Sequence, residues 1–367
     1  MKYKLSDICD YVKDKVNVAT LDRITYISTE NMLPNKVGIT KATTLPSTEQ
    51  TTMFQKGDVL VSNIRPYFKK IWYAEFDGGC SNDVLVFRAK KNISKQYLYY
   101  VISQDSFFNY SMATSKGTKM PRGDKKAIMQ YEVPCFSLEK QNRIAEILSA
   151  IDRKIKLNTE INENLLQQIE ALFKERYLTY DKLPFGWKRL LLGDVSDMMA
   201  GGDKPQNISD QQTAVYKYPI YSNGISDEGL YGFTTDYKIS EESVTVSARG
   251  TIGYVCLRHI PYTPIVRLIT LVPHLNTVSA KYLYLWLKCI PIHGTGTTQQ
   301  QLTVPDFRKT EIIVPPEVEM KNFTETVNPL FLQVWANQDE NTKLIDIRNT
   351  LLPRLMSGEL NVSNLGI

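Results

Sequence analysis

The chain has 367 residues, of which 43% are hydrophobic and 23% are charged. These ordinary globular values exclude a disordered chain and a collagen-like repeat, and the length predicts two or three domains. The longest apolar stretch, residues 282–292, is interrupted by Lys288 and Pro291, so we expect no transmembrane helix. Asp7 and Asp10 stand where a secretory signal needs an apolar run, which predicts a cytoplasmic protein.

The net charge of +5 is unevenly divided along the chain. Residues 1–183 carry 28 Lys and Arg against 21 Asp and Glu, whereas residues 184–367 carry 16 against 18. A mild basic excess is compatible with nucleic-acid binding but does not require it. The five cysteines form no C-x-x-C pair, and only three histidines are present. We therefore expect reduced, mostly buried thiols and no disulfide framework, metal site or cofactor in this chain.

A series of predicted elements in the first half recurs in the second half. The first half offers an opening segment at 5–10, a strand at 58–62 with Arg65 in the following turn, an amphipathic helix starting at 93–99, a Gly/Thr loop at 115–118 and a short strand at 131–134. The second half offers the same series at 192–197, at 243–247 with Arg249, at 278–284, at 294–297 and at 312–315. One offset of about 180 residues shared by all five segments indicates two homologous units.

A helical period follows the short strand of each half. Apolar residues there recur at spacings of four and three, which is typical of a coiled-coil seam, and a helix over residues 138–178 would be about 60 Å long. Both seams contain the step Asn-x-x-x-Asn-x-x-Leu. Polar seam residues commonly fix register, so we expect the helices to pair antiparallel near these asparagines; the alternative is that the asparagines face solvent where the seam opens. The predicted pairing residues are Ile144, Leu148, Ile151, Ile155, Asn158, Asn162 and Leu165 in the first helix, and Val327, Leu330, Val334, Asn337, Asn341 and Leu344 in the second.

These patterns together predict an α+β fold of two pseudo-symmetric repeats. Each repeat is a mixed α/β domain followed by a long helix, and the two helices pack as an antiparallel coiled coil. The predicted parts are a globular domain at residues 1–135, a helix at 136–178, a linker at 179–187, a second globular domain at 188–317, and a second helix with the C-terminal segment at 318–360.

Catalytic motifs are scarce in the sequence. No phosphate-binding P-loop and no dinucleotide-binding glycine turn occurs. Pro305-Asp306 with Glu319-x-Lys321 matches the letter pattern of metal-dependent nucleases, whose carboxylates and lysine would lie on a strand. Glu319 instead falls at the predicted start of the second long helix, where acidic residues are explained by the helix dipole. The sequence therefore does not favour a nuclease.

Polar and basic loops are the remaining candidates for chemistry. Residues 115–126 place five basic side chains beside glycines and hydroxyls, which suits phosphate contacts. Residues 62–70 combine amide and guanidinium groups, suited to base contacts, with aromatic rings. Counterparts at matched positions of the second half make an ordinary solvated surface the less favoured explanation. The candidate DNA-binding residues are Asn63, Arg65, Tyr67, Lys69, Lys70, Ser115, Lys116, Thr118, Lys119, Arg122, Lys125, Arg249, Thr251, Thr297, Thr298, Gln299, Gln300 and Gln301.

With the repeat and the paired helices in hand, the whole chain resembles the specificity subunit of type I restriction-modification systems. Residues 139–152, EKQNRIAEILSAID, look like the first helix of that family, and residues 351–360, LLPRLMSGEL, look like its carboxy-terminal signature. The second helix departs from the family pattern, because residues 319–323 lack the Glu-x-Gln-x-x-Ile opening found at 139–144.

The resemblance implies a non-catalytic subunit with two target recognition domains, each reading one half of a bipartite DNA site. Because the loops of the two halves differ in sequence and charge, we expect an asymmetric site. The implied partners are double-stranded DNA, two modification subunits docked on the helices that set the spacer and, in complexes that cleave, two restriction subunits. The partners would use S-adenosylmethionine for adenine methylation, and ATP and Mg for translocation and cleavage.

Three other interpretations stay open at this point. The chain could be the recognition subunit of a related methyltransferase-nuclease system, which is biochemically close. It could be a duplicated scaffold that binds only protein, with the polar loops as ordinary surface. A standalone enzyme is the third alternative.

Overall fold

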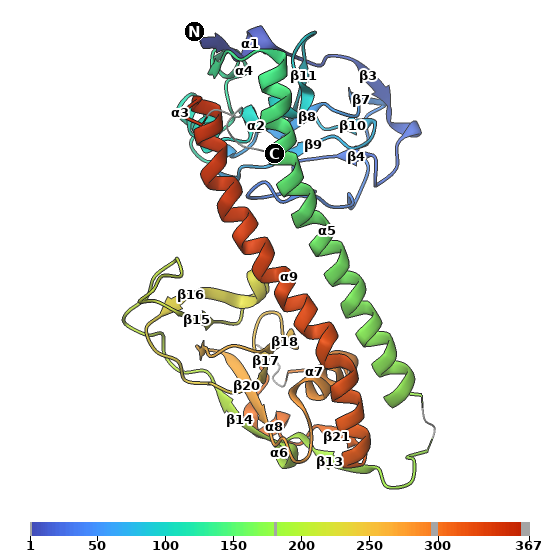
Figure 1. Ribbon diagram of the computed structural model, residues 1–367. Helices are drawn as coiled ribbons and strands as arrows, with labels where there is room; N and C mark the ends of the chain where they lie inside the picture. The colour runs from blue at the N-terminus through green and yellow to red at the C-terminus, as the bar shows by residue number, and fades with distance from the viewer. Residues whose placement is uncertain (1, 180–181, 295–299, 361–367) are drawn as a thin grey trace. The chain divides into compact units, whose positions relative to one another are not determined.

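The computed structural model describes residues 2–179, 182–294 and 300–360 (Figure 1). The chain divides into two compact units: unit 1 comprises residues 1–159 and 338–367, and unit 2 comprises residues 160–337. Two long helices, α5 (Leu138–Tyr177) and α9 (Glu317–Ser357), contribute residues to both units. Unit 1 is therefore built from two separate chain segments, whereas unit 2 is one continuous segment.

Unit 1 contains two four-stranded sheets, ordered β2-β11-β8-β9 and β3-β7-β10-β4, and the small pairs β1-β12 and β5-β6. Its strands are β1 (Lys2–Lys4), β2 (Cys9–Tyr11), β3 (Lys15–Asn17), β4 (Tyr26–Ile27), β5 (Met32–Leu33), β6 (Gly38–Ile39), β7 (Gln50–Phe54), β8 (Val59–Ser62), β9 (Ile71–Tyr73), β10 (Gly78–Cys80), β11 (Val84–Ala89) and β12 (Glu132–Pro134). Its helices, besides its part of α5 and α9, are α1 (Leu5–Ile8), η1 (Val18–Thr20), η2 (Pro66–Phe68), α2 (Lys95–Ile102), α3 (Asp105–Ala113) and α4 (Lys125–Ile128).

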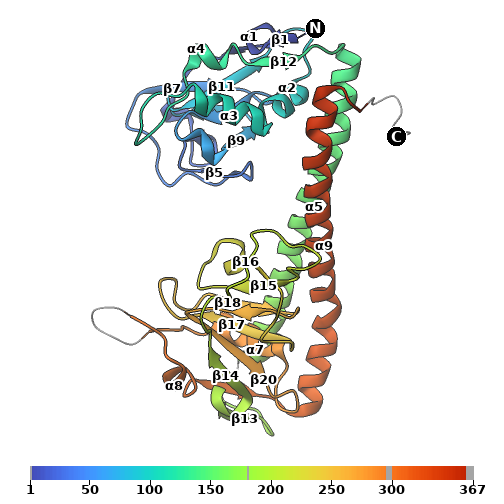
Figure 2. The same ribbon diagram turned by 90° about the vertical axis from the view of Figure 1, so that its left-hand side faces the viewer.

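Strand β8 is buried on both faces of its sheet. Alternate side chains of a strand point to opposite sides, so its residues enter two different clusters of the core. Val59 and Val61 pack with α2, with α5 and with the last turns of α9. Leu60 packs on the other face, against residues of the second sheet such as Phe54. Helix α2 thus lies between the sheet and the long helices, as Figure 2 shows.

Unit 2 repeats this plan with sheets ordered β14-β20-β17-β18 and β16-β15-β19 and the pair β13-β21. Its strands are β13 (Lys188–Leu191), β14 (Ser196–Ala200), β15 (Tyr218–Tyr221), β16 (Leu230–Thr234), β17 (Ser243–Ser247), β18 (Val255–Arg258), β19 (Thr263–Pro264), β20 (Leu268–Pro273) and β21 (Glu311–Val314). Its helices, besides its part of α5 and α9, are α6 (Leu192–Val195), η3 (Ser226–Gly229), α7 (Ala280–Cys289) and α8 (Val304–Phe307).

Helix α7 is the counterpart of α2, and both begin where the sequence predicted a helix start. The hydroxyls of Ser94 and Ser279 cap them by accepting hydrogen bonds from Tyr97 N–H and Tyr282 N–H. The first eight residues of α7, 280–287, are all buried, because the helix lies between a sheet and other helices (Figure 2), and the charged residue among them, Lys281, pairs with Glu242 at 2.6 Å. The predicted amphipathic pattern is therefore wrong for these residues. The predicted α+β fold of two repeats is confirmed.

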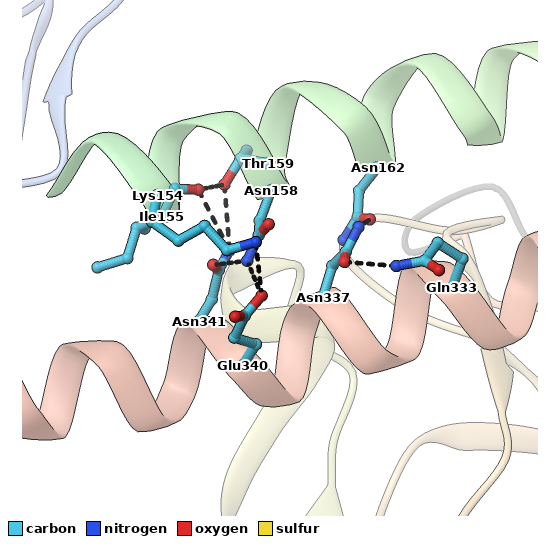
Figure 3. Close-up of polar contacts among 9 residues, drawn as sticks. All are labelled: Lys154, Ile155, Asn158, Thr159, Asn162, Gln333, Asn337, Glu340 and Asn341. Carbon is cyan, nitrogen blue, oxygen red and sulfur yellow. Dashed lines mark hydrogen bonds and ion pairs between the residues drawn. The ribbon is translucent and has the colours of Figure 1, made fainter. Parts of the chain in front are cut away.

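The halves of α5 and α9 that share a unit run antiparallel in both units. In unit 1, Arg348 Nη1 donates a 2.8 Å hydrogen bond to Asp152 Oδ1, and Asn158 Nδ2 donates to Asn341 Oδ1 at 2.9 Å. In unit 2, Asn337 Nδ2 donates to Asn162 Oδ1 at 2.8 Å (Figure 3), and Arg176 Nε donates to Glu319 Oε1 at 3.2 Å. The partner residue number falls as the α5 number rises, which defines the antiparallel direction.

The seam asparagines are interior residues of the helix pairs. Asn158, Asn162 and Asn337 are between 1% and 8% exposed, and Asn162 Nδ2 also donates to the carbonyl of Val334 at 3.0 Å. The alternative that they face solvent is therefore wrong, and α5 continues through them without a break. Among the described residues, no helix is both long and apolar enough to cross a membrane.

Candidate nucleic-acid interface

The turn after the central strand is the first common feature of the two units. Ser62, the last residue of β8, pairs with the first residue of β11, and Ser247, the last of β17, pairs with the first of β20. Counting from these serines makes Arg65 equivalent to Gly250. Both positions are left-handed, with φ of 50° and 77°. Arg65 and Arg249 thus both lie in the turn after the central strand, as predicted, but one position apart, because Arg65 occupies the left-handed position that Gly250 takes in unit 2.

In unit 1 the two predicted DNA-binding segments meet each other. Ile64 forms a β-bridge with Arg122, the N–H of Arg65 donates to the carbonyl of Pro121 at 2.8 Å, and the N–H of Gly123 donates to the carbonyl of Asn63 at 3.2 Å. A second bridge, between Lys116 and Arg122, closes the loop on itself. Segments about 55 residues apart in sequence thus form one surface, which we call the unit 1 reading surface (residues 63–70 and 115–125).

Acidic neighbours neutralise part of the charge on this surface. Lys116 Nζ lies 2.7 Å from Asp124 Oδ2, and Arg122 Nη2 lies 3.2 Å from Asp83 Oδ1. The hydrogen bond from Lys116, assisted by two backbone N–H groups of α4, lowers the pKa of Asp124 to about 2. Lys119 is exposed and forms no ion pair with any described residue, whereas Ser115 is occupied by a hydrogen bond to the carbonyl of Met112.

The remaining candidates of this loop differ in their surroundings. Thr118 is exposed, and Lys125 lies outside the loop as the first residue of α4, with an exposed side chain. Because α4 begins there, the five cations predicted to share one loop are divided between that loop and a helix.

An aromatic and basic ridge borders the turn. Tyr67 and Phe68 are 48% and 38% exposed, and Lys70 lies over the ring of Phe68 while donating to the carbonyl of Thr29 at 2.6 Å. Lys69 pairs with Asp105 at 2.9 Å, and Lys36 pairs with the same carboxylate.

Four residues of this region have positive φ: Asn35, Lys36, Arg65 and Lys69. The backbone of residues 35 and 36 donates hydrogen bonds to the carbonyls of residues 68 and 69, so the left-handed positions hold one another. Strained backbone of this kind persists only where its surroundings over-determine it, and it gathers at functional sites.

Asn63 does not occupy the exposed place predicted for a base-reading amide. It is only 7% exposed, and its Oδ1 has no hydrogen-bond partner among the residues that the structure describes. The reason is its position directly after β8, where the following bridge to Arg122 covers it. Arg65 is half-buried, and its Nε is likewise unpartnered within the described chain.

In unit 2 a side chain from another segment holds the equivalent turn. Asn223 Oδ1 accepts hydrogen bonds from the N–H groups of Ala248 and Arg249 at 2.8 and 3.4 Å, and Asn223 Nδ2 donates to the carbonyl of Arg249. Arg249 is half-buried and Thr251 is exposed. The turn residues 248–251 and the exposed residues 300 and 301 make up the unit 2 reading surface.

The polar loop of unit 2 reaches the same turn as its unit 1 counterpart. The N–H of Leu302 donates to the carbonyl of Ala248 at 2.9 Å, as the N–H of Gly123 does to the carbonyl of Asn63 at the equivalent position. Gln300 and Gln301 therefore lie next to the turn and are exposed. Thr297, Thr298 and Gln299 lie outside the described residues.

Sequence reasoning missed Asn223, Glu228 and Arg258. Their sequence context carries one usable signal, the run Ser222-Asn-Gly224 after the largely apolar residues 218–221, which is typical of a turn. Nothing in the sequence indicates that this turn contacts the one at 248–251.

The nuclease pattern has no catalytic geometry. Asp306 lies in α8, where its carboxylate accepts a hydrogen bond from Thr303 Oγ1, and Glu319 and Lys321 lie in the first turns of α9. No group of three His, Cys, Asp or Glu that could hold a metal ion occurs within residues 2–179, 182–294 and 300–360. Burial raises the pKa of the Cys9 and Cys80 thiols to about 12, which leaves them unreactive at neutral pH.

Comparison with known proteins places the chain beside specificity subunits. The family described as "Type I restriction modification DNA specificity domain" matches residues 1–167 and 184–342. A putative type I specificity subunit of Mycoplasma pneumoniae is 27% identical over 348 residues, covering 92% of this chain and 90% of that protein. The MjaIX specificity subunit of Methanocaldococcus jannaschii is 26% identical over 75% of this chain and 71% of its own. The crystal structure of the S subunit from M. genitalium has a TM-score of 0.58 at 17% identity, covering 97% of this chain and 96% of that one.

Proposed function

Because the chain belongs to the family of type I restriction-modification DNA specificity domains, with a matching domain in each half, we propose that each reading surface contacts one half of a bipartite DNA site. Chains of this family are non-catalytic specificity subunits with two recognition domains. The new elements of the proposal are the residues that do the reading and the way in which the two surfaces differ.

The proposal depends on one observation above all. In both units the loop that follows α3 or α7 donates a backbone hydrogen bond to the residue directly after the central strand, at equivalent ladder positions. A turn held in this way presents side chains in a fixed arrangement, and direct readout needs fixed donors and acceptors because each base pair displays its own pattern in the major groove. Arg65, Tyr67 and Lys119 in unit 1, and Arg249, Thr251 and Gln301 in unit 2, are the side chains we assign to contact DNA.

The two surfaces support different kinds of contact. Arg65, Lys70 and Lys119, which form no ion pair within the described chain, make the unit 1 surface basic, which favours phosphate contacts. The unit 2 surface has one arginine among hydroxyl and amide groups, which favours base edges. We therefore expect two half-sites of different sequence.

The long helices are the proposed docking sites for modification subunits. The seam residues Ile151 and Ile155 of unit 1, and Leu165 and Leu330 of unit 2, are only half-buried, which leaves apolar surface for a partner. In unit 2 a hollow of about 310 Å³ is lined by Leu172, Glu175, Arg176, Phe323, Thr326 and Val327.

For the assembled complex we propose two modification subunits and, where DNA is cleaved, two restriction subunits. S-adenosylmethionine, ATP and Mg would be bound by these partners. We place the complex in the cytoplasm, with recognition domains at residues 1–135 and 188–317 joined by helices and the linker at 179–187.

The central experiment is methylation by the complex reconstituted with its modification subunits, followed by sequencing of methyladenine in genomic DNA. We expect a bipartite, asymmetric motif. R249A should relax only the half-site read by unit 2, and R65A only the half-site read by unit 1, each by about tenfold in discrimination. A palindromic motif, or variants that leave both half-sites intact, would contradict the proposal.

The spacer is tested by lengthening both helices together. Seven residues inserted after Lys156 and seven after Asn341 keep the heptad seam and should lengthen the spacer by about three base pairs, since seven helical residues rise about 10 Å. Altered half-sites with an unchanged spacer would contradict this role. A scaffold that binds only protein would instead show no salt-dependent retention of DNA by the assembled complex.

A further inference from the structure

The hairpin tip at residues 222–229, between β15 and β16, lies outside the unit 2 reading surface but contacts its turn. It is closed at its base by the N–H of Ser222, which donates to the carbonyl of Gly229 at 2.8 Å. From this tip Asn223 makes the three hydrogen bonds to Ala248 and Arg249 described above. One amide side chain therefore contacts both the donors and the acceptor of the turn that carries Arg249.

A buried arginine fastens the other side of the hairpin tip to the central strand. The Arg258 side chain is 3% exposed, and its Nε donates to Thr245 Oγ1 in β17 at 3.0 Å. Its Nη2 donates to the carbonyl of Glu228 at 2.6 Å, and its guanidinium carbon lies 3.6 Å from the ring centroid of Tyr221. Arg258 thus joins the strand that ends in the reading turn to the hairpin that holds this turn.

The tip needs such a fastening because its backbone is strained. Asp227 and Glu228 have φ of 47° and 53°, values that non-glycine residues rarely adopt. Gly229 follows with φ of 83°, and a Cβ there would lie 2.4 Å from the carbonyl oxygen of Ser222. Conformations of this kind persist only when neighbours hold them in place.

Unit 1 holds its own turn by a different device. There the backbone of residues 64 and 65 pairs with residues 121 and 122 of the loop after α3. The described part of the unit 2 loop contacts its turn through the backbone bond from Leu302. The Asn223 side chain therefore occupies the role that backbone pairing has in the first repeat.

We propose that Asn223 is a positioning residue for base recognition by unit 2, and that Arg258 keeps the Asn223 hairpin in register with β17. The inference rests on the proposed function, because it assumes that turn 248–251 reads DNA. Loss of Asn223 frees the N–H and the carbonyl of Arg249 and leaves the N–H of Ala248 with only its 3.2 Å bond to the carbonyl of Arg267, so that the Arg249 side chain reaches more than one base.

The test uses the full-length subunit in complex with its modification subunits. N223A removes all three hydrogen bonds to the turn, and N223D keeps the acceptor for the two N–H groups but places a carboxylate against the carbonyl of Arg249. N276A is the matched control. Leu268, the first residue of β20, pairs with Ser247 next to the turn, whereas Asn276 follows the last residue of that strand, at its other end. The measurement is the extent of adenine methylation at genomic sites with the preferred half-site sequence, compared with sites that differ from it by one base. The ratio of the two is the discrimination at that half-site.

We expect N223A to relax discrimination at the unit 2 half-site by about tenfold, N223D by less, and N276A not at all. Discrimination at the unit 1 half-site should stay unchanged in every variant, which reports that the complex is folded and assembled. If N223A does not assemble, N223D decides the question by the same readout.

R249A distinguishes a failure of the proposed function from a failure of the positioning role of Asn223. If R249A leaves the unit 2 half-site unchanged, turn 248–251 does not read DNA and the proposed function fails at this site. If R249A relaxes the half-site while N223A and N223D do not, only the positioning role is overturned. R258K tests the role of Arg258. It retains the charge but not the planar contacts with Thr245 and Glu228, and we expect it to relax the same half-site as N223A.

Discussion

The two units close their hydrophobic cores with residues from different repeats of the sequence. The core of unit 2 includes Ile169, Phe173 and Tyr177, which are the last turns of the first-repeat helix α5. The core of unit 1 includes Leu352, Leu355 and Met356, which are the last turns of the second-repeat helix α9. A sequence repeat is therefore not a folding unit here, because each compact unit takes its final helical turns from the other repeat.

The largest effect should follow from removing the end of α9. A chain that stops after Asn349 lacks three buried side chains of unit 1, each worth about 2–5 kcal/mol as a truncation, against a total stability of about 5–15 kcal/mol for a domain. We expect α2 and β8 to lose protection from hydrogen exchange while α7 of unit 2 keeps it. Equal loss in both units would show that they do not fold separately.

Single substitutions that leave a cavity in one core should destabilise the unit that contains that core and not the other unit. Phe173 and Leu355 are each 0% exposed, one in each unit. We expect F173A to destabilise unit 2 by about 3–5 kcal/mol and L355A to destabilise unit 1 by about 2–5 kcal/mol, because each leaves a cavity. Denaturant titration followed by unit-specific hydrogen exchange measures both, and each variant is the control for the other. A change that appears in the wrong unit would contradict the assignment of the cores.

Removing an interhelical asparagine should lower the free energy of unfolding more in unit 2 than in unit 1. N162A leaves Asn337, which is 5% exposed, without its interhelical acceptor, and we expect a loss of about 1–3 kcal/mol. N158A should cost less, about 0.5–1.5 kcal/mol, since its partner Asn341 is half-buried and can turn to water.

The double variant N162L/N337L controls for the volume of the site. It should be at least as stable as the parent, because an apolar pair removes the need to desolvate two amides. A double variant as unstable as N162A would argue that packing, and not hydrogen bonding, accounts for the loss.

The charge difference between the reading surfaces predicts different salt dependences. K116A/K119A/R122A should lower the slope of log affinity against log salt by about 0.9 for each phosphate that the variant no longer neutralises, and Q299A/Q300A/Q301A should leave the slope unchanged. Because Lys116 and Arg122 already have acidic partners, we expect K119A alone to account for a large share of the change. Equal slopes for the two triple variants would refute the division between phosphate and base contacts.

The smallest expected effect is a pH dependence confined to unit 1. Folding lowers the pKa of Asp124 to about 2 from about 3.9 in an unfolded chain. The ionised carboxylate therefore stabilises folded unit 1 above about pH 4, and this contribution is lost as the pH falls towards 2. The difference in melting temperature between the parent and D124N should be constant from pH 5 to 8 and should shrink below pH 4. A difference that persists at pH 2 would contradict this cause.

Much of the architecture was predictable because local signals repeat. The strands at 58–62 and 243–247, the helices starting near residues 93 and 278 and the two long helices follow from the repeat and from periodicity, and the asparagine step predicted the pairing of α5 with α9. The offset also indicated which segments are equivalent, including the turns that carry Arg65 and Arg249.

The candidate site was less predictable, for reasons that particular residues show. Asn63 has the side chain of a base reader, yet its place directly after β8 buries it. Lys116 and Arg122 read as free cations in the sequence, yet Asp124 and Asp83 neutralise them. Such outcomes depend on neighbours brought in by other strands, which composition and spacing do not record.

The sequence by itself established the duplication, the element types and the family, because those depend on the order and period of residues along one chain. The three-dimensional fold established which loop meets which turn, that α9 completes unit 1 and α5 completes unit 2, and that Asn223 and Arg258 support the turn of Arg249. Contacts between residues far apart in sequence arise from the packing of whole strands and helices, so only the folded chain reveals them.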